Sequence, residues 1–87
     1  MRFHDVAFDR EERYAIGVEE ESGRYYLSIP VTNGIVDYEE VYEIDAASFE
    51  RYRADLASAL PFVERCRNRQ EDEHLILQPG RWRGTAL

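Results

Sequence analysis

The sequence predicts an α+β fold, in which helical segments cover one face of an antiparallel sheet. Between residues 14 and 44, three stretches alternate apolar and polar side chains with period two, as half-buried strands do. Glycine-containing pairs that favour tight turns separate these stretches. After residue 45, apolar side chains recur every three or four positions, which is typical of helices that bury one side. Together these observations predict a three-stranded antiparallel meander followed by helix.

The three predicted strands cover residues 14–18, 25–32 and 35–44. If Ser22-Gly23 and Asn33-Gly34 are two-residue hairpin loops, every apolar strand face meets an apolar face of its neighbour. A slip of one residue would turn each apolar set to the opposite side of the sheet. The two turns therefore predict one consistent core face. In this register Ile16 pairs with Ile29, and Val31 pairs with Val36.

Two residues do not fit this sheet. Pro30 falls in the central strand, where it cannot donate a ladder hydrogen bond, so we expect a bulge or an early end to regular pairing there. Glu40 falls opposite Leu27 on the apolar face. Three explanations for Glu40 are open: a bulge turns it outward, it lies beyond the cover of the helices, or it is a buried functional carboxylate.

Asp45 is placed to cap a helix, and Pro61 should kink it or divide it into two short helices. The fold class is thus a meander with a kinked helix or two short helices packed on one face. Residues 75–79 read as a short fourth strand. The last residues, including Arg81-Trp82-Arg83, read as an exposed tail. The core is expected to contain the following residues: Ile16, Leu27, Ile29, Val36, Tyr38, Phe49, Leu56 and Val63.

The 87 residues form a single domain, 1–87, since 44% hydrophobic and 13% aromatic content is too high for a disordered chain. The N-terminus has no apolar stretch of signal-peptide type, and no apolar run is long enough to span a membrane. The single cysteine, Cys66, cannot form an intramolecular disulfide. We therefore expect a cytoplasmic protein.

The net charge of −7 is unevenly distributed. Residues 1–48 hold four Arg against twelve acids, a charge of −8, whereas residues 49–87 hold seven Arg against six acids, a charge of +1. This balance argues against nucleic-acid and membrane partners, although Arg81-Trp82-Arg83 could stack on a base. It favours a protein partner with a basic surface.

Few residues suggest catalysis, a metal or a cofactor. His4 and His74 are far apart in sequence, and the acids at 71–73 lack metal-ligand spacing. Cys66 falls on the apolar helix stripe, where free cysteine is usually a buried small hydrophobe. No glycine-rich phosphate loop occurs. We therefore expect a protein that is not an enzyme and that binds no cofactor or metal.

The strongest candidate site lies on the sheet face away from the helices. In the predicted register, Tyr26 and Val41 are exposed cross-strand neighbours, and Arg24 lies opposite Glu43. A central aromatic residue with a charged rim is a common layout for a protein interface. The predicted partner-binding residues are Arg24, Tyr26, Asp37, Glu39, Val41 and Glu43.

The stretch "YYLSIPVTNGIVDYEEVYEI", together with "FVERCRNR", resembles small acidic bacterial proteins, some of which are similar to the immunity proteins that accompany secreted toxins. The resemblance covers residues 25–69 and carries over no functional residue. It implies a role in binding another protein.

Three functional hypotheses follow. The first is a protein-binding module that uses its acidic sheet face, in the manner of an immunity protein. The second is a small self-associating protein that forms a homodimer through sheet edges or faces. The third is a small-ligand binder or enzyme that uses Glu40 in a pocket between sheet and helix.

Overall fold

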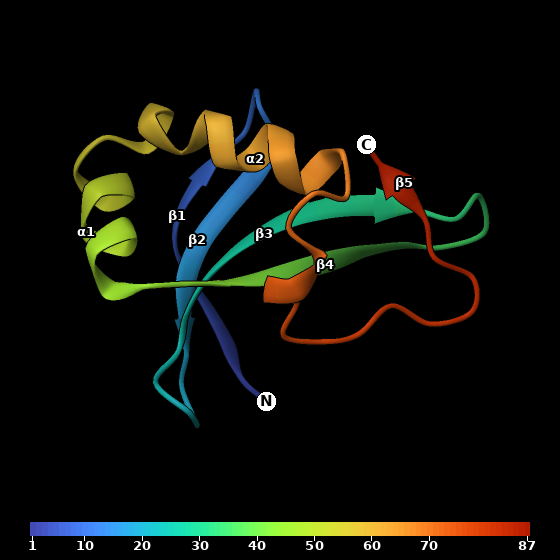
Figure 1. Cartoon of the computed structure of the whole chain (residues 1–87), viewed down its shortest axis with the longest axis horizontal. Helices are drawn as coiled ribbons and strands as arrows, with labels where there is room; N and C mark the ends of the chain where they lie inside the picture. The colour runs from blue at the N-terminus through green and yellow to red at the C-terminus, as the bar shows by residue number, and fades with distance from the viewer.

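The computed structural model describes residues 1–87 and confirms the α+β class: two helices pack on one face of an antiparallel sheet (Figure 1). The sheet order is β1-β2-β3-β4, and β5 pairs with β3. The elements in chain order are β1 (Phe3–Asp9), β2 (Tyr14–Glu19), β3 (Tyr25–Thr32), β4 (Asp37–Ile44), α1 (Ala46–Ala54), η1 (Leu56–Ala59), α2 (Leu60–Arg67), η2 (Asp72–His74) and β5 (Thr85–Ala86). No helix has the length and hydrophobicity needed to cross a lipid bilayer.

The predicted meander of β2, β3 and β4 is present, but both hairpin registers are shifted by two residues. Ile16 pairs with Leu27 rather than Ile29, and Val31 pairs with Tyr38 rather than Val36. A shift of two keeps every side chain on its predicted face, because strand side chains alternate. The face prediction is therefore confirmed and the residue pairs are wrong.

The shift arises because both hairpin loops are longer than two residues. In the first loop, the Glu19 amide donates to the Arg24 carbonyl at 2.8 Å. In the second, the Asn33 side-chain oxygen accepts from the amides of Ile35 and Val36, each at 2.9 Å. An Asn side chain of this kind stabilises a turn of its own. Val36 consequently lies in the loop and is 54% exposed, so its predicted place in the core is wrong.

Pro30 causes no bulge, and β3 pairs with β4 without interruption as far as Thr32 and Asp37. The Pro30 carbonyl accepts from the Leu87 amide at 3.1 Å, on the side of β3 that faces β5. Because the nitrogen and carbonyl of a strand residue point the same way, the missing donor also faces that side. Pairing with β2 has already ended at Ser28, so no ladder hydrogen bond is lost.

Two strands differ from the prediction. β1 adds a strand along the free edge of β2, with a bulge at Val6 between the pairs Asp5–Gly17 and Ala7–Ile16. Residues 75–79 do not form the predicted fourth strand; only Leu75 bridges to Tyr42. Instead, β5 arises from the tail that was expected to be exposed.

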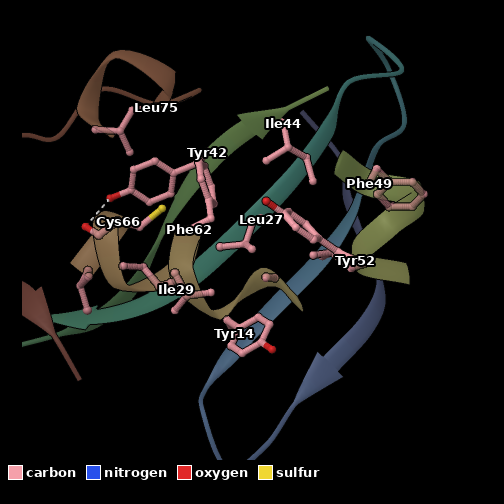
Figure 2. Packing of buried hydrophobic residues seen from close by; sticks show 14 residues of the cluster. Tyr14, Leu27, Ile29, Tyr42, Ile44, Phe49, Tyr52, Phe62, Cys66 and Leu75 are labelled. Carbon is pink, nitrogen blue, oxygen red and sulfur yellow. Dashed lines mark hydrogen bonds between the residues drawn. The ribbon is translucent and has the colours of Figure 1, made fainter. Parts of the chain in front are cut away.

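The helices follow the predicted plan of two short segments. The Asp45 side chain caps α1 by accepting from the Ser48 amide at 2.7 Å, and Pro61 lies in the first turn of α2. Their apolar side chains pack on Leu27 and Ile29 in the sheet (Figure 2). Cys66 is 1% exposed within this core, as expected, and burial raises the pKa of its thiol.

Candidate binding face

The face of the sheet that is turned away from both helices is here named the open face. Strand alternation and the pairing of β1 to β4 determine which residues lie on it. These residues are Phe3, Asp5, Phe8, Ala15, Gly17, Glu19, Tyr26, Ser28, Pro30, Thr32, Asp37, Glu39, Val41 and Glu43.

Five of the six predicted partner-binding residues lie on the open face, and Arg24 lies just before β3. Arg24, Asp37, Glu39 and Glu43 are exposed. Tyr26 and Val41, in contrast, are only 1% and 5% exposed, so the prediction that they form an exposed pair is wrong. They are not cross-strand partners either, because the register shift places Tyr26 opposite Glu43 and Val41 opposite Ser28.

Tyr26 is buried because side chains of β1, a strand that was not predicted, pack against it. Its hydroxyl donates to Asp5 Oδ1 at 2.5 Å, and the edge of the Phe3 ring packs against it with centroids 5.3 Å apart. Gly17, which separates Asp5 from Tyr26 in the sheet, makes this possible: a Cβ there would lie 2.5 Å from the Tyr26 hydroxyl. The ring therefore crosses β2 in a slot that only glycine provides.

Asp5 and Glu39 bring two negative charges together beside Tyr26. Partial burial and the charge of Asp5 raise the pKa of Glu39 above its ordinary value of 4.5. Neither carboxylate takes part in any ion pair of the structure, although the chain contains eleven Arg. Repulsion between these two carboxylates is therefore not relieved within the chain.

Ser28 lies next to Tyr26 among the outward-facing residues of β3, opposite Ala15 and Val41. It is 1% exposed, and its hydroxyl has no hydrogen-bond partner in the structure. Buried hydroxyl groups nearly always have a partner, so this unpaired group calls for an explanation.

Glu19 also lies on the open face, but its carboxylate is buried and binds backbone amides of the same chain. It is 1% exposed and accepts from the backbone amides of Arg2, Glu21 and Ser22 at 2.8, 3.0 and 2.8 Å. These hydrogen bonds lower the pKa of Glu19 from 4.5 to about 2. Sequence patterns do not reveal this role, because the donors come from the β2–β3 loop and from Arg2, just before β1.

The remaining charged residues of the open face form few ion pairs. Arg24 Nε lies 3.9 Å from Glu43 Oε1, so the predicted pair does meet, although as diagonal rather than opposite neighbours. Asp37 has no ion-pair partner. The exposed charges of the face are thus four carboxylates against the single Arg24 at its border.

Glu40, the residue that did not fit the predicted sheet, points to the helix side and is 6% exposed, opposite Ile29. No bulge turns it outward. Arg83 donates to both of its oxygens at 2.7 and 3.1 Å, and the Tyr42 hydroxyl donates at 2.7 Å. Arg83 also binds both oxygens of Asp72, at 2.7 and 2.8 Å.

Through these contacts Glu40 has a structural role, because it holds the C-terminal tail against the sheet. Neither of the two surface pockets of the molecule is lined by Glu40. The Glu40 carboxylate is instead occupied by Arg83 and Tyr42.

Glu71, Glu73 and His74 are the one group whose potential metal-ligand atoms lie together, all within 4.8 Å of one another. The sequence did not predict this grouping. Glu71 Oε2 is already paired with Arg65 Nε at 2.7 Å, and Glu71 Oε1 lies 3.4 Å from His74 Nε2. Glu73 is exposed. The internal ion pair accounts for the position of Glu71 without an ion.

A second exposed region lies where the β3–β4 loop meets the tail. Ile35, Val36 and Trp82 are 95%, 54% and 75% exposed, and a pocket of about 280 Å³ is lined by Asn33, Ile35, Trp82 and Arg83. We name Ile35, Val36 and Trp82 the tip patch. The red tail segment runs past this loop in Figure 1.

Comparison with known proteins identifies no relative. No protein-family model matches the sequence, and no curated protein or solved structure is significantly similar to this chain.

Proposed function

We propose that this protein is a non-enzymatic binding module whose open face docks a basic surface of another protein. The observation that carries the proposal is the group of unpaired carboxylates, Asp5, Asp37 and Glu39, on a sheet face that no helix covers. None of the three carboxylates has a cation within the chain, and only Asp5 accepts a hydrogen bond, from the Tyr26 hydroxyl, so all three can pair with cations of a partner molecule. The net charge of −7 adds long-range attraction for a basic protein.

The burial of Tyr26 changes how such a face would work. Tyr26 is buried and cannot contact a partner directly. The groups available for contact are the carboxylates and the rings of Phe3 and Phe8, which are 36% and 57% exposed. Aromatic side chains beside charged groups are frequent in protein interfaces. The resemblance to immunity proteins is consistent with this kind of partner.

The test is capture of the partner from the native host, with bound proteins identified by mass spectrometry at low and high salt. The bait is compared with a triple variant of the open face, Asp37→Asn, Glu39→Gln and Glu43→Gln. A matched control neutralises three exposed acids elsewhere, Glu50→Gln, Glu64→Gln and Glu73→Gln.

The proposal requires one basic protein that wild type and control retain, that the open-face variant loses, and that salt releases. Equal capture by both triple variants would mean that the open face is not the binding surface.

A second candidate function, self-association into a homodimer, is favoured by the tip patch. Three large apolar side chains exposed together are unusual on a small monomer and are typical of a contact surface. A second copy would bury both tip patches against each other around a two-fold axis. The expected result is a mass that rises toward a dimer with concentration in sedimentation equilibrium, and Trp82→Ala should abolish that rise. A monomeric mass at all concentrations would exclude this candidate.

A further inference from the structure

β1 is the outermost strand of the sheet and has no neighbouring strand on its outer side (Figure 1). Its large apolar side chains are exposed: Phe3, Val6 and Phe8, with Met1 just before the strand, are four of the nine large apolar residues exposed on the surface. An exposed apolar edge strand is a template for pairing with a further strand, and most proteins protect such edges. The free edge of β1 is therefore a candidate contact surface.

The backbone groups that point to this edge follow from the strand pairing. The Glu19 amide donates to the residue that precedes β3, so every second residue of β2, from Glu19 back to Ala15, faces β3 rather than β1. The partners of these β2 residues in β1 are Phe3, Asp5 and Phe8. Two opposite residues that do not exchange hydrogen bonds point away from each other. The amide and carbonyl groups of Phe3, Asp5 and Phe8 therefore point to the free edge.

The bulge at Val6 gives Phe3 and Phe8 the same orientation. Residues five positions apart in a regular strand would have side chains on opposite faces and backbone groups at opposite edges. The extra residue of the bulge shifts this alternation by one, so both rings lie on the open face and both backbones face the free edge. A bulge often interrupts pairing at an edge, but this one aligns two aromatic residues along it.

We propose that the free edge of β1 pairs antiparallel with β1 of a second copy around a two-fold axis and joins the two sheets into one. In the register that overlaps residues 2–9 of both copies, Phe3 of each copy lies opposite Phe8 of the other. Aromatic residues directly opposite each other on one face stabilise an antiparallel pair, and symmetry makes each contact occur twice. The pairing does not depend on the proposed function, because it needs no basic partner.

The same register matches opposite charges on the helix side of the sheet. The Arg2 carbonyl accepts from the Glu20 amide, so the pairing with β2 extends to Arg2. Arg2 of one copy then lies opposite Asp9 of the other, and both side chains point to the helix side because their neighbours in β1 are the two outward rings. Neither Arg2 nor Asp9 takes part in an ion pair within the chain. This complementarity favours a second copy as the occupant of the edge.

The experiment measures the mass of the full chain by sedimentation equilibrium over a range of concentrations, at low and high salt. The mass should rise toward that of a dimer, and more strongly at high salt, because salt screens the repulsion between two chains of net charge −7. Hydrogen exchange followed by NMR locates the contact. The amides of Phe3 and Phe8 should exchange more slowly as the dimer forms, and that of Trp82 in the tip patch should not change.

Two variants of apolar residues test the aromatic contact. Phe8→Ala should weaken the dimer roughly tenfold, because symmetry removes two aromatic pairs at once. Leu77→Ala removes an apolar side chain that is also exposed but lies outside the sheet, so it is the matched control and should leave the affinity unchanged.

Two charge variants test the register. Asp9→Arg should weaken the dimer about threefold to tenfold, because it places like charges opposite each other at two positions. The change in net charge alone would act in the other direction, since it lowers the repulsion between the chains. Adding Arg2→Asp should restore the affinity. Both variants lack the hydrogen bond that Asp9 accepts from the Glu12 amide, so their difference reports on the charge pair.

A monomeric mass at every concentration, or equal affinity in wild type, Phe8→Ala and Asp9→Arg, would overturn the pairing. Loss of the dimer in Trp82→Ala, with full affinity in Phe8→Ala, would assign the contact to the tip patch instead. Failure of the proposed function is distinguishable, because salt releases a basic protein from the open face but strengthens pairing through β1.

Discussion

Glu39 and Glu40 are consecutive residues of β4, and they belong to opposite faces of the sheet. Glu40 points toward the helices, where Arg83 and Tyr42 bind both of its oxygens. Glu39 points to the open face, where partial burial and the like charge of Asp5 raise its pKa. One carboxylate is neutralised within the chain, while its neighbour has no cation.

Glu40 is thus a carboxylate that holds the tail to the sheet, whereas Glu39 has no cation within the chain. Glu39 and Glu40 have the same side chain, so residue type alone does not show which of them is paired within the chain. What differs is the presence of a cation: the tail brings Arg83 to Glu40 on the helix side, whereas the one arginine at the border of the open face, Arg24, pairs with Glu43 and not with Glu39. The following variants test this difference, from the largest expected effect to the smallest.

Arg83→Ala should cost the most stability. It leaves Glu40 buried with its charge unpaired and frees the tail, and removal of one partner from a buried ion pair costs about 3–5 kcal/mol. Arg83 and Glu40 side chains are 14% and 6% exposed, so water cannot readily replace the guanidinium. Urea unfolding followed by circular dichroism measures the loss.

The double variant Arg83→Ala with Glu40→Gln serves as the control, because it removes the unpaired charge. It should recover part of the stability, since a neutral amide is less costly to bury than a carboxylate. A loss below about 1 kcal/mol in Arg83→Ala, the value of an exposed pair, would mean that Glu40 is solvated and that the two faces do not differ.

Glu19→Gln should come next, and its effect depends on pH. Three backbone amides lower the pKa of Glu19 from 4.5 to about 2, so the ionised form is favoured in the folded state. Its contribution is therefore fully present above pH 4.5 and is lost as pH falls from about 4.5 toward 2. Urea midpoints measured across this range should fall for wild type and less for Glu19→Gln. Glu20→Gln, an exposed neighbour, should follow wild type; a Glu19→Gln curve parallel to wild type would show that Glu19 holds no such bonds.

Gly17→Ala tests the slot that keeps Tyr26 in place. The new Cβ would press on the Tyr26 ring and on the backbone of His4, and overpacking of this kind costs about 1–3 kcal/mol. Gly80→Ala is the matched control, because nothing lies within 4 Å of a Cβ at that position. A fluorescence-monitored urea curve for Gly17→Ala that overlays that of Gly80→Ala would contradict the packing of Tyr26 over β2.

The features that could be predicted from sequence are those encoded in local alternation. The meander, its two faces and the divided helix follow from period-two and period-3.6 patterns and from Pro61. The cross-strand residue pairs could not be predicted from these patterns, because the register of a hairpin depends on the length of its loop. Asn33 extends the second loop by binding two amides through its side chain, a detail that the pair Asn33-Gly34 does not reveal.

The site was predicted less well because its contacts join distant parts of the chain. β1 escaped notice because its bulge at Val6 breaks the alternation that would identify a strand. Without β1, which supplies Asp5 and Phe3 as partners of Tyr26, the alternation alone predicts an exposed tyrosine. The sequence did mark Glu40 as anomalous, but Arg83 lies 43 residues away and no spacing rule links the two.

Glu39→Gln should have the smallest effect on stability, and its sign should be opposite to that of the others. Because the pKa of Glu39 is raised in the folded state, its ionised form is disfavoured by folding. The penalty is present at neutral pH and disappears as pH falls through the raised pKa toward 4.5. Removing the charge should therefore leave stability unchanged or raise it by up to about 0.5 kcal/mol, since solvent screens an exposed carboxylate.

Glu43→Gln is the comparison for this variant, because Glu43 is also exposed on β4 but lies beside Arg24. Loss of that surface pair should lower stability slightly, by up to about 0.5 kcal/mol. The difference in sign between the two variants, measured in urea at pH 7 with and without salt, isolates the unrelieved repulsion at Glu39. If Glu39→Gln instead loses more than about 1 kcal/mol, Glu39 holds the fold together, as Glu40 does, and is not a carboxylate left free for a partner.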